Sequence, residues 1–194
     1  MIKAIIFDCF GVLVTDALEE IVQEVRQRNP AGADEIVALV RASNKGIMAP
    51  TESSKQIAAL LGTEVTEYRQ KIKDGEVKNT ALLEYVVSLR RSYKTAMLSN
   101  IGKGSLAKRF SEEDLERYFD VVVASGDVGY AKPEARAYEI VAERLGVRLD
   151  ECVFTDDREI FCEAARGVGM QAIVYRDFET FKTELTGVLN QSGK

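Results

Sequence analysis

Five short apolar segments separated by helical patterns constrain the fold of this chain most. We expect these segments to be strands: Ala4–Phe7, Thr95–Leu98, Val121–Ala124, Cys152–Thr155 and Gln171–Val174. Strands that alternate with helices form βαβ units, which place the strands parallel in one sheet. The sequence therefore predicts an α/β fold with a Rossmann-like parallel sheet.

The clearest predicted helix lies between the third and fourth strands. It would run over Pro133–Leu145, with proline in the first position, apolar residues on one face and Gly146 closing it. Another helix start is expected at Ser111, because Asp114 follows three residues later in a pattern of the capping-box type. Both helices fit the alternation of strands and helices.

Residues 16–79 depart from this alternation, because they contain no convincing strand. Four amphipathic stretches follow one another there: Leu18–Arg28, Asp34–Ser43, Thr51–Leu61 and Thr66–Lys73. A crossover between parallel strands needs one helix. We therefore expect residues 1–15 and 80–194 to form the core, and residues 16–79 to be an all-helical insertion above the carboxyl ends of the strands. The alternative is a helical layer packed flat on the sheet.

Composition excludes several classes of function. The chain of 194 residues has no histidine, so Ser-His-Asp and Cys-His catalysis are excluded and a metal site would use oxygen ligands, which favours Mg²⁺. A net charge of −5 with interspersed signs argues against a nucleic-acid partner. No apolar run approaches the roughly 20 residues that span a bilayer, so no membrane partner is expected. Cys9, Cys152 and Cys162 are expected to be buried reduced thiols, as in a cytoplasmic protein.

Polar residues follow each of the first four predicted strands. Asp8 comes directly after the first strand, and Ser99 follows the second. Lys132 precedes the helix after the third strand, where the helix dipole disfavours a cation unless it reaches an anion. Asp156 and Asp157 follow the fourth strand and would repel each other unless a cation offsets them. Because ligands bind at the carboxyl ends of parallel strands, this set predicts a site for phosphoryl chemistry.

Each of these residues also has an ordinary structural explanation. Ser99 alone would be a helix N-cap, and Lys132 alone a solvated surface lysine. One acid of the pair would cap the following helix, which leaves the other unexplained. The functional interpretation therefore depends on the whole set: acid, hydroxyl, lysine and acid pair at successive strand ends.

In this order the residues resemble the four motifs of the haloacid dehalogenase (HAD) superfamily, over nearly the full length of the chain. The residues that match motifs one to four are Asp8, Ser99, Lys132 and the pair Asp156-Asp157. Three segments are most similar to the branch that contains α-D-glucose-1-phosphate phosphatases: Leu98–Asn100, Gly129–Arg136 and Phe154–Asp157. The helical insertion is similar to the C1 cap of that family.

The resemblance implies a Mg²⁺-dependent phosphatase that forms an aspartyl-phosphate on Asp8. The metal ligands would be Asp8, the Phe10 carbonyl, Asp157 and Asp156, the last either directly or from behind the other ligands. The remaining catalytic residues would be Ser99 and Lys132, and the substrate-binding residues Gly11 and Asn100. The substrate would be a small phosphorylated metabolite such as a sugar phosphate, and the protein a cytoplasmic monomer or homodimer.

Phe10 departs from the pattern of HAD phosphatases, which usually have a second aspartate there as acid and base. Three interpretations follow. The first is a phosphatase whose leaving group is protonated through water or the substrate, since the glucose-1-phosphate branch also lacks that aspartate. The second is a 2-haloacid dehalogenase, which has an aromatic residue there; such enzymes use no metal and usually have Ser-Asn in place of Asp156-Asp157. The third is a non-catalytic binding or regulatory protein.

Smaller features concern the surroundings of the site. Arg158 and Phe161 occupy positions where the related branch tends to have asparagines. Arg158 would contact phosphate or shield the acids, and Phe161 would pack. The residues of the insertion expected to contact substrate are Lys45, Gly46, Met48 and Tyr68.

Overall fold

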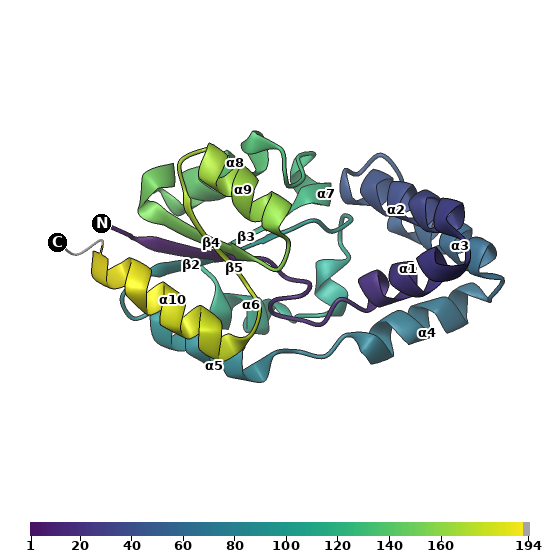
Figure 1. Ribbon diagram of the computed structural model, residues 1–194, viewed down its shortest axis with the longest axis horizontal. Helices are drawn as coiled ribbons and strands as arrows, with labels where there is room; N and C mark the ends of the chain where they lie inside the picture. Colours follow the sequence, from purple (N-terminus) through teal and green to yellow (C-terminus); the bar gives the residue numbers. More distant parts are fainter. Residues whose placement is uncertain (192–194) are drawn as a thin grey trace.

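The computed structural model describes residues 1–191 and contains one parallel five-stranded sheet (Figure 1). The strand order is β3-β2-β1-β4-β5. The strands are β1 (Ala4–Phe7), β2 (Lys94–Ser99), β3 (Val121–Ala124), β4 (Cys152–Asp156) and β5 (Gln171–Val174). The predicted Rossmann-like α/β fold is confirmed, and every predicted strand is present.

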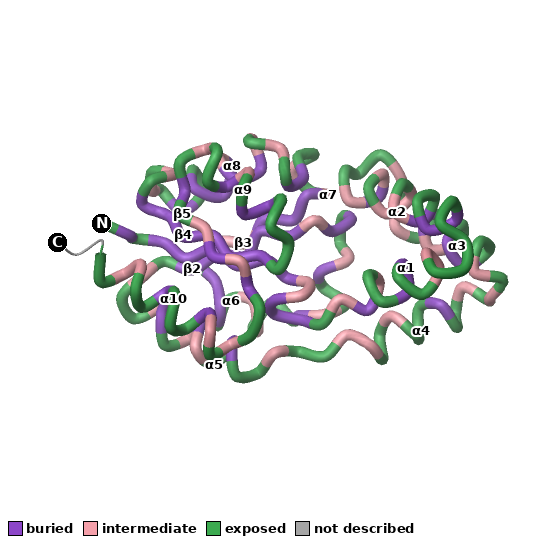
Figure 2. Tube along the Cα trace, in the orientation of Figure 1, coloured by how far each residue is buried: buried purple, intermediate pink, exposed green. Residues whose placement is uncertain are grey.

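β1 is the central strand, and its position decides where Asp8 lies. Phe7 is in register with Met97 of β2 and with Thr155 of β4. Asp8 therefore emerges between the ends of these two strands, where ligands bind in open parallel sheets. All four residues of β1 are buried, as expected of a strand covered on both faces (Figure 2).

Helices cover both faces of the sheet (Figure 1). The helices on one face are α5 (Thr80–Leu89), α6 (Glu112–Tyr118) and α10 (Phe178–Gln191). Those on the other face are α8 (Ala135–Leu145) and α9 (Glu159–Gly167). Shorter pieces of helix are α7 (Ser125–Val128), η1 (Leu106–Lys108) and η2 (Leu149–Glu151). Alternation along β1 sends Ile5 and Phe7 into one core and Ala4 and Ile6 into the other.

Four further helices form a separate group at the carboxyl ends of the strands (Figure 1). They are α1 (Ala17–Arg28), α2 (Pro30–Asn44), α3 (Pro50–Leu61) and α4 (Val65–Gly75), and we call them the helical unit. Their apolar residues, among them Ile21, Ile36 and Ile57, form a cluster of their own. The alternative of a helical layer flat on the sheet is therefore wrong, because other helices cover both faces.

Two of these helices show why they begin where they do. The Asp16 carboxylate accepts a hydrogen bond from the Glu19 amide at the start of α1, at 3.0 Å. Asn29 accepts one from the Gly32 amide at the start of α2, also at 3.0 Å, with Pro30 in the first turn. α2 thus begins earlier than the predicted stretch Asp34–Ser43, because the Asn-Pro pair is the cap.

Two chain segments join the helical unit to the sheet. The outgoing linker is residues 8–16, and the return linker is residues 76–79. They pair through Thr15, whose amide donates to the Val77 carbonyl at 3.0 Å and whose hydroxyl accepts from the Val77 amide at 2.7 Å. The Asn79 amide donates to the Leu13 carbonyl at 2.9 Å. These bonds make the two linkers a single paired connection.

The helical unit also contacts the sheet domain at the end of α2. The Asn44 carbonyl accepts a hydrogen bond from the Ser125 hydroxyl of α7 at 2.6 Å. Gly102 lies so close to Ser43 and Pro50 that a Cβ at this position would overlap both side chains. The unit is therefore held over the strand ends at two places, the paired linkers and the end of α2.

The prediction that Pro133 begins a helix is wrong. α8 begins at Ala135, and Pro133 follows a cis peptide bond in the preceding turn. The Glu134 carboxylate, just before the helix, accepts a hydrogen bond from the Ala131 amide at 3.0 Å and closes that turn. The predicted start at Ser111 is confirmed, since its hydroxyl accepts from the Asp114 amide at 3.0 Å at the start of α6.

The three cysteines are buried and form no disulfide, as predicted. Burial raises the pKa of Cys152 and of Cys162 to about 12, so both stay protonated near neutral pH. Across residues 1–191, no helix has the length and apolarity needed to cross a membrane.

Candidate active site

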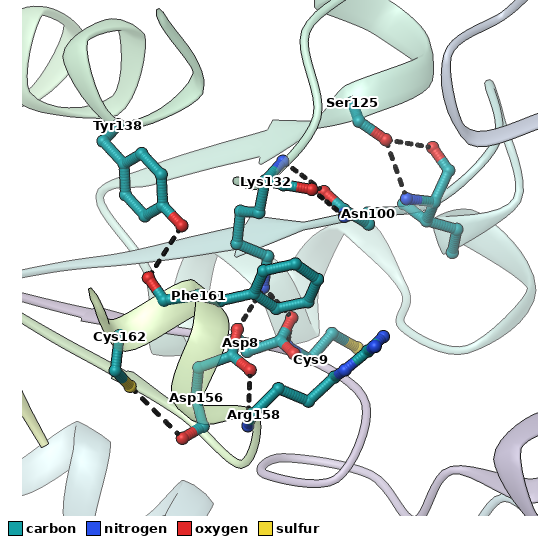
Figure 3. A network of polar contacts seen from close by, with 11 residues as sticks. Asp8, Cys9, Asn100, Ser125, Lys132, Tyr138, Asp156, Arg158, Phe161 and Cys162 are labelled. Carbon is teal, nitrogen blue, oxygen red and sulfur yellow. Dashed lines mark hydrogen bonds and ion pairs between the residues drawn. The ribbon is translucent and has the colours of Figure 1, made fainter. Parts of the chain in front are cut away.

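Lys132 joins two carboxylates at the strand ends (Figure 3). Its Nζ lies 2.7 Å from Asp8 Oδ1 and 2.6 Å from Asp156 Oδ2. The side chain is 3% exposed, so these charges meet away from solvent. Burial by itself lowers the pKa of Lys132, but the two carboxylates outweigh it, and the pKa lies above its usual value. Lys132 is therefore a buried cation, and the surface-lysine explanation is wrong.

Asn100 fixes the main chain of Lys132. Its side-chain amide donates to the Lys132 carbonyl at 2.9 Å, and its carbonyl oxygen accepts from the Lys132 amide at 2.8 Å. These reciprocal bonds tie the end of β2 to the loop that carries the lysine. Asn100, predicted to bind substrate, has its side chain committed to positioning Lys132.

Asp8 is held in one orientation by its neighbours. Oδ1 accepts from Lys132 and from the Cys9 amide, the latter at 2.6 Å. Burial raises the pKa of Asp8 well above its usual range and repulsion from Asp156 raises it further, while Lys132 opposes both effects. An additional cation beside Asp8 would favour its ionised form.

A third carboxylate completes the acidic cluster. Oxygen atoms of Asp8, Asp156 and Asp157 all lie within 4.8 Å of one another. Burial, with repulsion from Asp156 and then Asp16, raises the pKa of Asp157 to about 6. Three carboxylates therefore meet around a single lysine, which leaves an excess of negative charge and a set of hard oxygen donors.

Gly11 gives Asp157 the space for its carboxylate. Gly11 has φ +82°, a left-handed conformation, and a Cβ built on it would overlap the Asp157 carboxyl group. The turn from Asp8 through Phe10 to Gly11 therefore has to contain glycine at this position. Gly11, predicted to bind substrate, lies against the acidic cluster.

These residues fit a Mg²⁺ ion. Asp8 and Asp157 offer carboxylate oxygens, and the Phe10 carbonyl belongs to the turn between Asp8 and Gly11. Asp156 is already engaged, because Oδ2 accepts from Lys132 and Oδ1 from the Arg158 amide at 2.9 Å. With both oxygens occupied, Asp156 orients Lys132 and would stand behind the other ligands of a bound ion.

Ser99 has a buried hydroxyl without a partner. Its side chain is fully buried, and none of residues 1–191 offers Oγ a hydrogen bond. The N-cap explanation is wrong, because the next helical element, η1, begins only at Leu106. An unpaired buried hydroxyl is costly, and a ligand oxygen would satisfy it.

The cap explanation for the acid pair is also wrong. Arg158 is the residue before α9, and that helix has no side-chain cap. Phe161, in the first turn of α9, lies near two cations: Lys132 Nζ is 5.2 Å and the Arg158 guanidinium carbon 4.8 Å from its ring centre. Phe161 thus packs as expected, with its ring beside the end of the Lys132 side chain (Figure 3).

Three of the four residues predicted to contact substrate from the helical unit lie in one connection, between α2 and α3, and the fourth lies elsewhere. Lys45 Nζ forms an ion pair with Glu134, in the turn that contains Lys132, at 3.1 Å, and Gly46 lies against the Gly126 carbonyl of α7. Met48 is half-buried in the same connection between α2 and α3. Tyr68 is buried in the helical unit's own apolar cluster.

The sequence analysis missed Arg109. Its guanidinium forms a 2.5 Å ion pair with Glu76 of the return linker and lies 5.1 Å from the ring centre of Phe10. Nothing in the local sequence marks it, because Arg109 stands in a polar loop among other charged residues.

Comparison with known proteins agrees with this geometry. The family of haloacid dehalogenase-like hydrolases matches residues 2–169. A D-ribitol-5-phosphate phosphatase of Bacteroides thetaiotaomicron is 27% identical over 98% of this chain and 100% of its own length.

Solved structures are similar in fold. A HAD-like family hydrolase of Porphyromonas gingivalis has a TM-score of 0.76 at 25% identity, covering 97% of this chain and 98% of that one. The HAD family enzyme bt-2542 of Bacteroides thetaiotaomicron, solved with magnesium and inorganic phosphate, has a TM-score of 0.72 at 24% identity, covering 93% and 99%. With the motif residues in place at the strand ends and a family match over most of its length, the chain belongs to the haloacid dehalogenase-like hydrolases.

Proposed function

We propose that this protein is a Mg²⁺-dependent phosphatase that acts on a small phosphorylated metabolite through an aspartyl-phosphate on Asp8. The observation that carries the proposal is the contact of Lys132 with Asp8 and Asp156, next to the carboxylate of Asp157. A sugar phosphate or sugar-alcohol phosphate is the proposed substrate class, supported by the ribitol-phosphate phosphatase that matches along the whole chain.

The first step is attack of the Asp8 carboxylate on phosphorus, with cleavage of the bond to the leaving oxygen. Lys132 holds Asp8 in a fixed orientation from 2.7 Å, and the Ser99 hydroxyl is free to donate to a phosphoryl oxygen. Mg²⁺ bound by Asp8, Asp157 and the Phe10 carbonyl would offset repulsion between the carboxylate and the phosphate. In the second step water attacks phosphorus and the bond between phosphorus and the Asp8 oxygen breaks. The Asp8 carboxylate is restored, and the proton of the attacking water leaves with the phosphate or passes to solvent.

Phe10 cannot supply a proton to the leaving group. We propose that the leaving oxygen takes its proton from water or from the substrate itself. General acid catalysis is worth about 10²–10⁴ in rate, so substrates with poor leaving groups should react slowly.

We propose that residues 16–79 form the cap of this site. The end of α2 and the loop after it contact α7 and the Lys132 loop through Ser125 and Glu134. A cap in this position would exclude water from the strand ends and contribute to substrate choice.

The decisive experiment is phosphate release from p-nitrophenyl phosphate and a panel of sugar and sugar-alcohol phosphates, with and without Mg²⁺. The Asp8→Asn variant serves as the control. We expect turnover that requires both Mg²⁺ and Asp8. Turnover that persists in Asp8→Asn, or silence across the panel, would refute the proposal.

Phe10 supports one second candidate, a 2-haloacid dehalogenase, because expulsion of halide needs no proton. The paired acids Asp156 and Asp157 favour the metal-dependent reaction instead. Halide release from 2-chloropropionate without added metal would favour the dehalogenase.

A further inference from the structure

A half-buried ion pair connects the return linker to the sheet domain. Arg109 follows η1, in the loop after β2, and Glu76 is the first residue after α4. Their side chains are 18% and 11% exposed, and the charged atoms lie 2.5 Å apart. Charges removed from solvent to this extent interact more strongly than an exposed pair, and either charge left alone there is costly.

The guanidinium of Arg109 has two further contacts. Nη1 donates to the Ser105 carbonyl at 2.9 Å, which fixes the arginine to its own loop. The guanidinium carbon lies 5.1 Å from the ring centre of Phe10, a distance typical of a cation–π contact. One side chain therefore contacts the loop after β2, the return linker and the turn that follows Asp8.

Glu76 and Phe10, the two residues that Arg109 contacts outside its own loop, adjoin the paired linkers and the acidic cluster. Glu76 precedes Val77, which pairs with Thr15 of the outgoing linker. Phe10 lies two residues after Asp8 and precedes Gly11, which packs against Asp157. A shift of Arg109 would therefore reach both the linkers and the turn that presents the proposed metal ligands.

We propose that Arg109 is a positioning residue that couples the placement of the helical unit to the geometry of the metal site. It holds the return linker through Glu76 and the Phe10 turn through the aromatic ring, so the two keep one relative arrangement. The inference rests on the proposed function for the identity of the metal, Mg²⁺.

A second ion pair in the same linker provides a matched control. Lys78 Nζ lies 2.9 Å from Asp114 of α6, and these side chains are 40% and 34% exposed. Lys78 also lies 4.7 Å from the ring centre of Phe110. Lys78 thus ties the linker to the sheet domain with a similar pair of contacts, but through Phe110 instead of the Phe10 turn.

The test compares Arg109→Met, Glu76→Gln and Lys78→Met with the unaltered protein. Mg²⁺ binding is measured by calorimetry without substrate, and amide hydrogen exchange is followed in the two linkers. In Arg109→Met and Glu76→Gln we expect Mg²⁺ affinity to fall about tenfold, as when a residue supporting a metal ligand is removed, and linker exchange to rise about tenfold. Lys78→Met should keep Mg²⁺ affinity within about twofold, because exposed ion pairs contribute little.

Arg109→Lys keeps the charge without the planar guanidinium and should recover part of the Mg²⁺ affinity. It also keeps the test open if Arg109→Met does not fold. Unchanged Mg²⁺ affinity in both Arg109→Met and Glu76→Gln, or an equal loss in Lys78→Met, would overturn the inference. Failure of the proposed function is distinct, since it would show as absent phosphate release by the unaltered protein, while hydrogen exchange still tests the coupling.

Discussion

Replacing Gly11 with alanine should have two effects. It should lower the stability of the fold by straining the backbone, and it should weaken Mg²⁺ binding at the proposed metal site. Gly11 has φ +82°, where a side chain costs about 1–2 kcal/mol. That cost alone lowers the melting temperature by roughly 2–8 °C for a chain of this size. The added methyl group would also overlap the Asp157 carboxylate, which then has to move. Displacement of a proposed ligand should weaken Mg²⁺ binding by at least about tenfold.

Gly62 separates these two effects. It ends α3 with φ +69°, and a Cβ there would meet nothing within 4 Å. Gly62→Ala should therefore lower the melting temperature by a similar amount and leave Mg²⁺ binding unchanged. The assay is calorimetric Mg²⁺ titration of both variants, with thermal melts in the presence and absence of Mg²⁺. Wild-type Mg²⁺ affinity in Gly11→Ala would refute the assignment of Asp157 as a ligand.

Four further predictions concern the positioning of Lys132, the effect of pH on Mg²⁺ affinity and on stability, and the leaving group. Asn100→Ala removes two hydrogen bonds to the Lys132 main chain, at about 1 kcal/mol each, and should lower both the melting temperature and kcat; an unchanged kcat would contradict the positioning role. The raised pKa of Asp157 is about 6, so the metal-free carboxyl is protonated below that pH, and Mg²⁺ titrations should show affinity falling as pH drops through 6. Asp157→Asn should weaken this dependence without abolishing it, because the pKa of Asp8, the other proposed carboxylate ligand, is also raised. By the same linkage, ionising Asp157 opposes folding, so through this group the metal-free protein gains stability as pH falls from about 6 towards 3.8, which melts across that range would measure. Across a series of aryl phosphates, rates should rise as the leaving-group pKa falls, since Phe10 supplies no acid; a flat series with chemistry rate-limiting would remove this expectation.

The sheet and the core of the site could be predicted from local sequence. Short apolar runs mark strands, and in a parallel sheet the residues that follow them must meet at one edge. Asp8, Lys132 and Asp156 were identified in this way, and each of the two carboxylates lies within 2.7 Å of the Lys132 Nζ. Four successive amphipathic stretches likewise predicted the helices of the insertion. These features depend on patterns among residues that are close in the sequence, so they can be predicted from the sequence alone.

Other features depend on residues that only folding brings together. Asn100 and Lys132 are 32 positions apart, and Arg109 and Glu76 are 33 apart, so no local pattern marks either contact. α8 begins at Ala135 and not at the predicted Pro133, because the Glu134 side chain closes a turn before the helix. Helix propensity near a proline carries no information about that contact. The different contacts of Asp156 and Asp157 also depend on the folded structure. Two adjacent carboxylates look alike in sequence, and they differ here because one is buried against Lys132 while the other lies beside Gly11.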